Sequence, residues 1–595
     1  MKNFKSEYPR PQFVRNTWQS LNGIWNITLN HIQRQCEYKL EFESELKPAQ
    51  YADTIQVPFC PESSLSGIGN KEFLAGMTYQ RDISIPSDWR DMDIHLNCGA
   101  VYYKCAVYID GRLTGCHTGG NVSFMIDLTR FTEPGKTHSL VIVVKNDLFS
   151  DEQPSGKQSK TYNSRGCLYT RTTGIWQTIW LEGVDRRALK DIYAVPDLSS
   201  TALVLTPRFH SVTKGQILRV QVLDEGNVVA EEKRKTVEGI PFSIGIPKPK
   251  LWSPESPFLY DLILEVLDNN TVIDRVESYF GMREVSIEGN EFLLNGKPFY
   301  QRLVLDQGFY SDGIWTSPSD EALKNDIILS KKAGFNGARL HQKVFEERFF
   351  YWADKLGYLC WGETASWGSD PNKDGLMHMN VLSELREELV RDRNHPSIAA
   401  WTPFNETSHV YNRENHARIH VACYNLCKSV DPSRPVNDSS GYIHYVTDLY
   451  TVHNYEQDPN KLKDILRLDS AGKPFRNCPD KDAAYRGEPY IIDEFGGIKW
   501  DSKVMESVDE DDPLQKKNQW KSWGYGKDVS SLKEFYHRLE GQVETILSLD
   551  HICGYCYTQL TDVEQETNGI YLYDRTSKFD LDKIHKIFSR QPERY

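Results

Sequence analysis

The stretch Ile398-Ala-Ala-Trp-Thr-Pro-Phe-Asn-Glu406 places a carboxylate directly after a short apolar run. A second stretch, Ile491-Ile-Asp-Glu-Phe-Gly-Gly497, has the same layout and contains Glu494. Short apolar runs bounded by polar or glycine-containing sequence are typical of buried parallel strands, and the carboxyl ends of such strands in a barrel lie on one face. We therefore predict that Glu406 and Glu494 each follow a strand and face a common pocket.

The sequence after residue 283 alternates strand-like and helical runs. Strand-like runs cover residues 298–304, 335–340, 358–361, 398–401, 435–437, 448–452, 490–493 and 552–557. Helical periodicity covers residues 320–333, with Ser319 as candidate N-cap, 345–356, 381–391 and 414–430. Eight strand and helix units in about 300 residues predict a C-terminal (β/α)8 TIM barrel over residues 284–595. Glu406 then follows the fourth strand, and Glu494 follows the seventh.

Residues 1–283 have the periodicity of β-structure. Alternating apolar runs recur at residues 23–29, 77–85, 103–110 and 139–144, and Asp110-Gly111 is a strong hairpin signal. These features predict an N-terminal jelly-roll β-sandwich over residues 1–184. Runs at residues 202–205, 216–222 and 259–266 predict a second, smaller β-sandwich over residues 185–283. The predicted chain is therefore multidomain, with β-domains followed by an α/β domain.

The chain has 595 residues and a formal net charge of −13. Because no concentrated basic face accompanies this acidic balance, we expect no nucleic-acid partner. No run approaches the roughly 18 apolar residues of a membrane span and the N-terminus lacks a secretory signal, so we expect a cytoplasmic protein without a membrane partner. The 12 Cys are scattered rather than arranged as metal ligands, and we expect no metal and no cofactor.

Two strand-end carboxylates that face one pocket suit the hydrolysis of a glycosidic bond. Further motifs support this interpretation by their order and spacing. They are Trp18-Gln-Ser-Leu-Asn-Gly-Ile-Trp25, Val57-Pro-Phe59, His117-Thr-Gly-Gly120, Thr170-Arg-Thr-Thr-Gly-Ile-Trp176, Leu251-Trp-Ser-Pro254, Asn394-His-Pro396, Phe404-Asn-Glu406 and Glu494-Phe-Gly496. With these motifs the chain resembles glycoside hydrolase family 2, the family of β-galactosidases, β-glucuronidases and β-mannosidases, over nearly its whole length.

The resemblance implies an N-terminal jelly-roll, an immunoglobulin-like β-sandwich and a catalytic barrel. It also implies retaining hydrolysis of a terminal β-linked sugar by double displacement. In such enzymes the glutamate of the Asn-Glu pair is the general acid and base, which gives that role to Glu406. The later strand-end glutamate is the nucleophile, which gives that role to Glu494. The lack of a secretory signal favours exo-action on a small oligosaccharide or glycoside over endo-action on a polysaccharide.

Several other strand-end residues are candidates for substrate binding. Asn405 is expected to bond the 2-hydroxyl of the sugar, and Tyr455, in the motif His453-Asn-Tyr455, to donate a hydrogen bond to Glu494. The remaining candidates are Asp306, Arg339, His341, His453, Glu363, Asp562 and Glu564. We expect Arg339 to hold Glu494 or Glu363 in an ion pair. Asp562 and Glu564 either bind sugar hydroxyls or cap the last helix.

The second strand ends in Arg339-Leu-His-Gln342, where family members often have Arg-x-Ser-His. A structural role for His341 is therefore as plausible as a ligand role. β-Glucuronidases of the family carry an Asn-x-Lys motif that grips the substrate carboxylate, and the corresponding Asn568-Gly-Ile570 lacks the Lys. Arg339 or Lys343 could substitute for it. We expect a β-galactosidase-like activity first, and a glucuronide, galacturonide, mannoside, glucoside or arabinopyranoside as alternatives.

Two further expectations concern regions outside the motifs. Residues 499–528 form an insertion with four large aromatic residues and an acidic run, which could stack on sugar or pack against a neighbouring subunit of a homo-oligomer. A non-catalytic carbohydrate-binding protein is the main alternative from another functional class. It predicts the loss of one catalytic carboxylate, and both are present.

Overall fold

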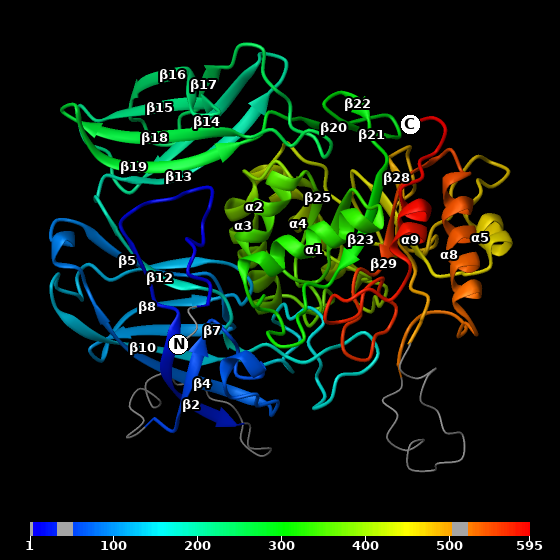
Figure 1. Ribbon diagram of the computed structural model, residues 1–595, viewed down its shortest axis with the longest axis horizontal. Coiled ribbons are helices and arrows are strands. Elements are labelled where there is room, and N and C mark those ends of the chain that lie inside the picture. The colour runs from blue at the N-terminus through cyan, green and yellow to red at the C-terminus, as the bar shows by residue number, and fades with distance from the viewer. Residues whose placement is uncertain (1–3, 32–50, 502–521) are drawn as a thin grey trace.

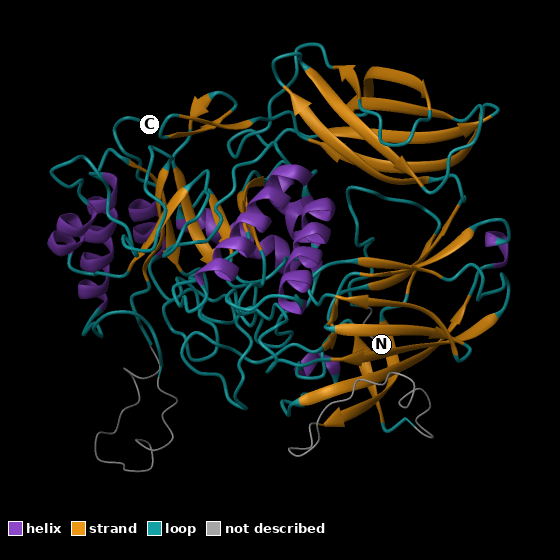
Figure 2. Cartoon of the chain, turned by 180° about the vertical axis from the view of Figure 1, so that it is seen from behind, coloured by secondary structure: helices purple, strands orange, loops and turns teal. Residues whose placement is uncertain are grey.

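The computed structural model describes residues 4–31, 51–501 and 522–595 (Figure 1). Two β-rich parts lie beside a C-terminal part in which helices surround a parallel sheet. The view from behind shows the same division, with the longer helices gathered around the parallel sheet (Figure 2). No helix of the described residues is both long enough and apolar enough to cross a bilayer.

The N-terminal part consists of two antiparallel sheets that enclose one apolar core. The larger sheet has the order β3-β2-β4-β10-β7-β8, and the smaller has the order β1-β12-β5-β9. The strands are β1 (Trp18–Ser20), β2 (Gly23–His31), β3 (Asp53–Val57), β4 (Leu74–Ser84), β5 (Asp93–Cys98), β7 (Lys104–Ile109), β8 (Arg112–Thr118), β9 (Phe124–Asp127), β10 (Thr137–Lys145) and β12 (Ile179–Val184), with the short pair β6 (Val101–Tyr102) and β11 (Gly174–Ile175). The Asp110-Gly111 hairpin joins β7 to β8, and both residues have positive φ, 49° and 78°.

The second β-rich part also packs two antiparallel sheets around a core of its own. Its sheets have the orders β13-β14-β17 and β16-β15-β18-β19. The strands are β13 (Leu189–Asp197), β14 (Ala202–Phe209), β15 (Ile217–Asp224), β16 (Asn227–Lys235), β17 (Phe242–Gly245), β18 (Tyr260–Asp268) and β19 (Thr271–Phe280). The jelly-roll and immunoglobulin-like classes of the two β-rich parts stay predictions, as do the exact domain limits.

The C-terminal part opens with a small antiparallel sheet of β20 (Val285–Glu288), β21 (Glu291–Leu294) and β22 (Lys297–Pro298). Its parallel sheet has the order β26-β25-β24-β23-β29-β28-β27. The strands are β23 (Gln301–Asp306), β24 (Gly337–Leu340), β25 (Leu359–Glu363), β26 (Ile398–Thr402), β27 (Tyr450–Asn454), β28 (Tyr490–Gly496) and β29 (Ile552–Thr558), and the helices are α1 (Asp320–Ala333), α2 (Glu347–Leu356), α3 (Leu376–Asp392), α4 (Arg413–Val430), α5 (Pro459–Leu466), α8 (Leu532–Leu547) and α9 (Leu581–Phe588). The predicted N-cap of the first helix is confirmed, because Ser319 accepts a hydrogen bond from the Ala322 amide.

The fifth predicted strand is reduced to isolated bridges. The backbone at residues 435–440 pairs with the fourth strand through Val436 opposite Trp401 and Ser440 opposite Asn405. On the side of β27, a side-chain oxygen accepts in place of a backbone carbonyl, since the Gly441 amide donates to Thr451 Oγ1 at 3.0 Å. The Trp401 amide donates to the Pro435 carbonyl at 3.1 Å, and the Asn437 amide donates to the Trp401 carbonyl at 2.9 Å, so the backbone pairing here is limited to short bridges. The sheet is therefore closed between β26 and β27 by single contacts.

Side chains of the parallel strands alternate between two apolar layers. Leu303 and Leu305 of β23 belong to the inner cluster, whereas Val304 packs in the outer cluster under the helices. On β24, Ala338 and Leu340 lie in the outer cluster. Because residues two apart share a face of a strand, Arg339 and His341 point inward at the carboxyl end of the sheet.

Candidate active site

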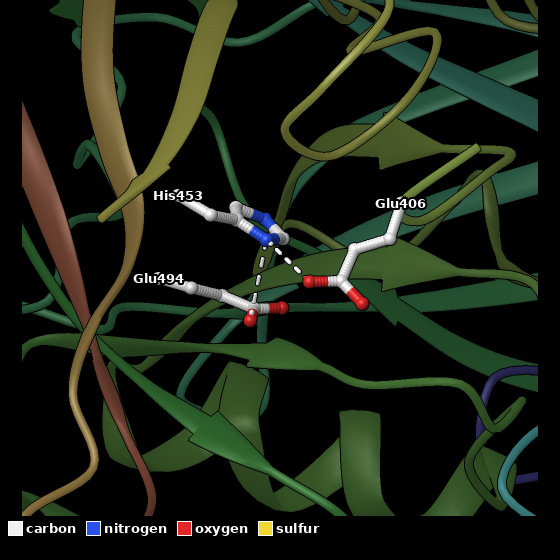
Figure 3. A group of neighbouring side chains, drawn as sticks. All are labelled: Glu406, His453 and Glu494. Carbon is white, nitrogen blue, oxygen red and sulfur yellow. Dashed lines mark hydrogen bonds and ion pairs between the residues drawn. The ribbon is translucent and has the colours of Figure 1, made fainter. Parts of the chain in front are cut away.

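Glu406 and Glu494 meet at one imidazole (Figure 3). His453 Nδ1 lies 2.9 Å from Glu406 Oε1 and 3.3 Å from Glu494 Oε2. One ligand atom from each of the three residues lies within 4.8 Å of the other two. The carboxylates that follow the fourth and seventh predicted strands are therefore neighbours in space.

Glu406 sits on strained backbone beside the fourth strand. Its φ is +53°, a left-handed conformation that non-glycine residues rarely adopt, and its amide donates to the Ser440 carbonyl at 3.0 Å. Its half-buried side chain borders a groove of about 250 Å³ that Trp367, Phe404 and His409 also line. The carboxyl group thus has one side toward His453 and another toward an open groove.

A bulge in β28 directs two consecutive carboxylates into the site. Ile492 and Phe495 both pack in the outer apolar layer, three residues apart. Regular alternation would place the side chains of two successive residues on opposite faces, but the pairing with β29 shifts between these two positions. As a result, Asp493 and Glu494 both point inward, where each has an ion-pair contact with Arg339.

Arg339 is the centre of the buried network, with a fully buried side chain. Nε donates to Glu363 Oε2 at 2.8 Å, and Nη1 donates to the Asp493 carbonyl at 2.9 Å. Nη2 lies 3.1 Å from Glu494 Oε1 and 2.8 Å from Asn405 Oδ1. The expected ion pairs of Arg339 are present with both glutamates, and the planar guanidinium fixes their relative positions.

The surrounding charges keep Glu494 ionised. Burial alone would raise the pKa of Glu494, but His453 and Arg339 lower it to about 2. Burial disfavours the imidazolium of His453, whereas Glu494, Asp493 and Glu406 favour it, and the net effect raises the pKa of His453. Its other nitrogen, Nε2, lies 2.9 Å from the Ser440 hydroxyl. Glu494 is thus a buried anion beside the Arg339 guanidinium and the His453 imidazole.

Tyr455 completes the surroundings of Glu494. Its hydroxyl donates to Glu494 Oε2 at 2.5 Å. Its ring stacks on Tyr525 with 3.4 Å between centroids and 4° between planes, and Trp523 packs edge-on against Tyr525. In the described part of the aromatic insertion, these rings therefore support Tyr455 from behind. Trp520 and the acidic run at residues 509–512 lie outside the described residues.

Asn405 and His341 border the same space. The Asn405 amide nitrogen Nδ2 is buried, and none of the described residues accepts its hydrogens, while its Oδ1 is held by Arg339. Arg339 Nη2 also lies 2.8 Å from His341 Nδ1, and burial together with Lys157 and Arg339 lowers the pKa of His341 well below its usual range. The lowered pKa favours the neutral form of His341, whose Nδ1 also lies 3.0 Å from Glu363 Oε1. Asn405 presents a free donor to the site.

Three predicted site residues lie elsewhere. Asp306 points to the helix side of β23, where burial and Asp326 raise its pKa to about 6, since residues 304 and 306 share the outward face. Asp562 accepts hydrogen bonds from Lys578 at 2.8 Å and from the Gly569 amide at 2.9 Å. Glu564 accepts from the Thr170 amide at 3.1 Å. Asp306 accepts from the Gly308 amide at 2.9 Å and faces away from Glu406 and Glu494, whereas sugar binding by Asp562 and Glu564 stays a prediction.

The sequence analysis missed several residues of the site. Trp367 donates from Nε1 to the Asn405 carbonyl at 3.1 Å, and its ring packs edge-on toward His341. Glu566 is buried, and its charge raises the pKa of Lys157. The charge of Glu494 raises the pKa of both residues, so both lie near the site. Glu566 lies only two residues beyond Glu564, in a stretch already considered polar. Lys157 had no sequence signal, because it comes from the β-rich part some 250 residues before Glu406.

Known proteins share this architecture. A family model for "Glycosyl hydrolases family 2" matches residues 188–283, and a model for "Glycosyl hydrolases family 2, TIM barrel domain" matches residues 285–497. The chain is 25% identical over 460 residues to a β-glucuronidase of Paenibacillus borealis, covering 72% of this chain and 74% of that protein. It is also 25% identical over 462 residues to a β-galactosidase of Lactococcus lactis, covering 71% of this chain and 42% of that protein.

A solved structure agrees in fold. The crystal structure of Ruminococcus gnavus β-glucuronidase superposes with a TM-score of 0.79, at 18% sequence identity, over 99% of both chains. At this identity the likeness concerns the fold alone. Two family models together match more than half of the chain, and the parallel barrel carries two neighbouring glutamates. This chain therefore belongs to glycoside hydrolase family 2 and is a glycosidase.

Proposed function

We propose that the chain is a retaining, exo-acting β-glycosidase with Glu494 as nucleophile and Glu406 as general acid and base. The observation that carries the proposal is the shared contact of both carboxylates with His453 Nδ1, with oxygens of the two groups within 4.8 Å. Retaining enzymes need carboxyl groups about 5 to 5.5 Å apart, whereas inverting enzymes need roughly 6.5 to 9.5 Å. The geometry supports retention.

The first step forms a covalent bond between Glu494 and the sugar. The Glu494 carboxylate attacks the anomeric carbon, the bond to the aglycone oxygen breaks, and Glu406 in its acid form gives its proton to that oxygen. A low pKa of Glu494 suits an attacking group that must be ionised. The groove of about 250 Å³ beside Glu406 offers space for the departing aglycone.

The second step uses water. Glu406, now a carboxylate, takes a proton from water as its oxygen attacks the anomeric carbon, and the ester bond to Glu494 breaks. Glu494 leaves as a carboxylate, which Arg339 and Tyr455 stabilise. The Asn405 amide is free to donate to the 2-hydroxyl, where an interaction that strengthens toward the transition state accelerates both steps.

β-Galactosides are the first candidate substrates. The two cations named as replacements for the missing Lys at position 570 are occupied: Arg339 binds carboxylates and Asn405, and Lys343 donates to the carbonyls of Gly308 and Trp315. β-Glucuronides are the candidate that the relatives favour, because several of them, among them the one from Paenibacillus borealis, bear the name β-glucuronidase.

The test is a panel of 4-nitrophenyl β-glycosides, with the anomeric configuration of the first product followed by NMR. The proposal requires turnover of at least one β-glycoside with retention, and loss of more than about a thousandfold in kcat for Glu494→Gln. Glu564→Gln is the matched control, since this glutamate belongs to the same rim but binds the Thr170 amide. An inverted product, or full activity of Glu494→Gln, contradicts the assignment.

A further inference from the structure

A segment of the N-terminal part reaches the mouth of the barrel. It follows β10 and runs beside the loop after β29, which Figure 1 shows in cyan and red. The Gly156 amide donates to the Ala365 carbonyl at 3.0 Å, and the Tyr169 amide donates to the Lys157 carbonyl at 2.8 Å. A Cβ at Gly156 would lie 2.1 Å from the Gln342 carbonyl oxygen, so this glycine permits the close approach. The segment thereby carries Lys157 to the site.

Lys157 is a buried residue whose ammonium group contacts aromatic rings. Only 4% of the residue is exposed, and the contacts that the structure gives for its ammonium group are with the rings of Trp367 and Tyr169. Nζ lies 5.6 Å from the centre of the Trp367 ring and 5.8 Å from that of Tyr169. These cation–π contacts position the ammonium group but leave its three N–H donors unused. Glu566, Glu494 and Glu406 favour the charged form against burial and raise the pKa of Lys157, so an ammonium group is held here with N–H donors available to a ligand that accepts.

The loop after β29 places acceptors near this donor. Glu566 is buried and accepts hydrogen bonds from the Tyr169 hydroxyl and, at 3.0 Å, from Asn568 Nδ2. A carboxylate has about four acceptor positions, so two stay available. The Asn568 carbonyl oxygen Oδ1 is also buried, and no described residue donates to it. Tyr169 lies between Lys157 and the loop after β29, since its ring faces Lys157 and its hydroxyl binds Glu566.

The combination of donor and acceptors selects the chemistry of the ligand. Neighbouring sugar hydroxyls each donate one hydrogen and also accept, so one hydroxyl can accept from Lys157 while the next one donates to Glu566. A uronic-acid carboxylate only accepts, so at this position it would satisfy Lys157 but would have no proton to donate to the neighbouring Glu566 carboxylate.

We propose that Lys157 and Glu566 form a specificity pair that binds neighbouring hydroxyls of a neutral sugar, so that the substrate is a β-hexoside or β-pentoside without a carboxylate. This inference rests on the proposed function. Lys157 donates to one hydroxyl oxygen, and Glu566 accepts from a hydroxyl next to it.

Lys157→Met tests the donor, because methionine keeps the unbranched stem and removes the ammonium group. With the best neutral 4-nitrophenyl β-glycoside, we expect kcat/KM to fall about ten- to hundredfold, the loss of one charge-assisted hydrogen bond. The loss should nearly disappear with the one deoxy substrate that lacks the bound hydroxyl. Lys160→Met is the matched control, because Lys160 lies in the same segment, is 35% exposed and pairs with Asp151. It should leave kcat/KM unchanged.

Binding measurements separate a failure of this inference from a failure of the proposed function. Isothermal titration with isofagomines of the glucose and galactose configurations, and with their uronic counterparts, needs no turnover. We expect a neutral compound to bind at least about tenfold more tightly than its uronic counterpart, and Lys157→Met to remove most of that affinity. Tighter binding of the uronic compounds, or unchanged affinity and kcat/KM in folded Lys157→Met and Lys157→Arg, overturns the inference. Loss of turnover by all glycosides with intact neutral binding overturns only the proposed function.

Discussion

Replacing Tyr455 by Phe removes one hydroxyl group from the surroundings of the proposed nucleophile. The hydroxyl donates to Glu494 Oε2 at 2.5 Å, and Glu494 is 3% exposed. Phenylalanine keeps the ring that stacks on Tyr525, so the local packing is preserved. The hydrogen bond favours the ionised carboxylate, and its loss must therefore raise the pKa of Glu494.

The size of the change follows from the strength of such a bond. A hydrogen bond to a charged group contributes about 1.5 to 3 kcal/mol, and 1.36 kcal/mol corresponds to one pKa unit. The pKa of Glu494, about 2 in the intact site, should rise by about 1 to 2 units. A carboxylate works as nucleophile only when ionised, so the acid limb of kcat/KM moves to higher pH. At neutral pH the residue stays ionised in both proteins.

The two chemical steps respond differently to this substitution. In the first step Glu494 loses negative charge, so a missing hydrogen bond does little harm. In the second step the negative charge returns to Glu494, and the Tyr455 hydroxyl stabilises it. We therefore expect the second step to slow about tenfold or more, with accumulation of the glycosyl-enzyme.

Two readouts follow with the preferred 4-nitrophenyl β-glycoside. Rapid-quench assays should show a burst of 4-nitrophenol in Tyr455→Phe, followed by a slower steady rate. Initial rates from pH 3 to 8 should show the acid limb of kcat/KM at higher pH in Tyr455→Phe than in the unmodified protein. Tyr424→Phe is the control, since its hydroxyl donates to Asp448 Oδ1 at 2.7 Å, far from the site, and it should change neither readout. An unshifted acid limb and no burst would refute the role of Tyr455.

Two further substitutions test which residues belong to the hydrogen-bond network around Arg339. Arg339→Lys keeps the charge but loses the planar set of donors to Glu363, Asn405 and Glu494. In steady-state assays of protein shown by circular dichroism to be folded, kcat/KM should therefore fall at least about a hundredfold. A loss below about fivefold would contradict the positioning role. Asp562→Asn leaves the buried Lys578 without its counter-charge, so thermal unfolding should reveal a loss of about 3 to 5 kcal/mol while KM stays constant. A large increase in KM instead would place Asp562 in the sugar site.

Local patterns in the sequence were sufficient for the regular part of the barrel. The run before Glu406 forms β26, the run at residues 491–493 forms part of β28, which continues through Glu494 to Gly496, and Ser319 caps α1 as predicted. These features depend on neighbouring residues alone, through strand alternation, capping and apolar periodicity. The fifth predicted strand pairs with the fourth only through isolated bridges at Val436 and Ser440, and the apolar pattern of its own residues does not reveal this.

The errors in the site arise from side-chain direction. Asp306 ends a strand as Glu363 does, but side chains alternate between the two faces of a strand, and the Asp306 side chain lies on the outer face with Val304. Conversely, Asp493 and Glu494 would point to opposite faces in a regular strand, and the bulge brings both inward. Such a bulge depends on the pairing with neighbouring strands, so the residues of one strand do not reveal it.

Contacts between distant parts of the chain lay beyond sequence patterns altogether. Lys157 reaches the site only because the segment after β10 packs on the barrel mouth, with Gly156 close to the Gln342 carbonyl. Tyr525 supports Tyr455 from an insertion that was expected to stack on sugar or on another subunit. In both cases the relevant partner becomes visible when the domains are placed together.

The assignment of Glu494 as nucleophile is tested most directly by trapping the covalent intermediate. The protein is incubated with the 2-deoxy-2-fluoro analogue of its preferred β-glycoside, which forms the glycosyl-enzyme but releases it slowly. Peptic digestion and tandem mass spectrometry then locate the added sugar. We predict one equivalent of label on Glu494, in the peptide that contains Ile491-Ile-Asp-Glu-Phe. Label on Glu406 or on Asp493 would contradict the account, as would inactivation that leaves Glu494 unmodified.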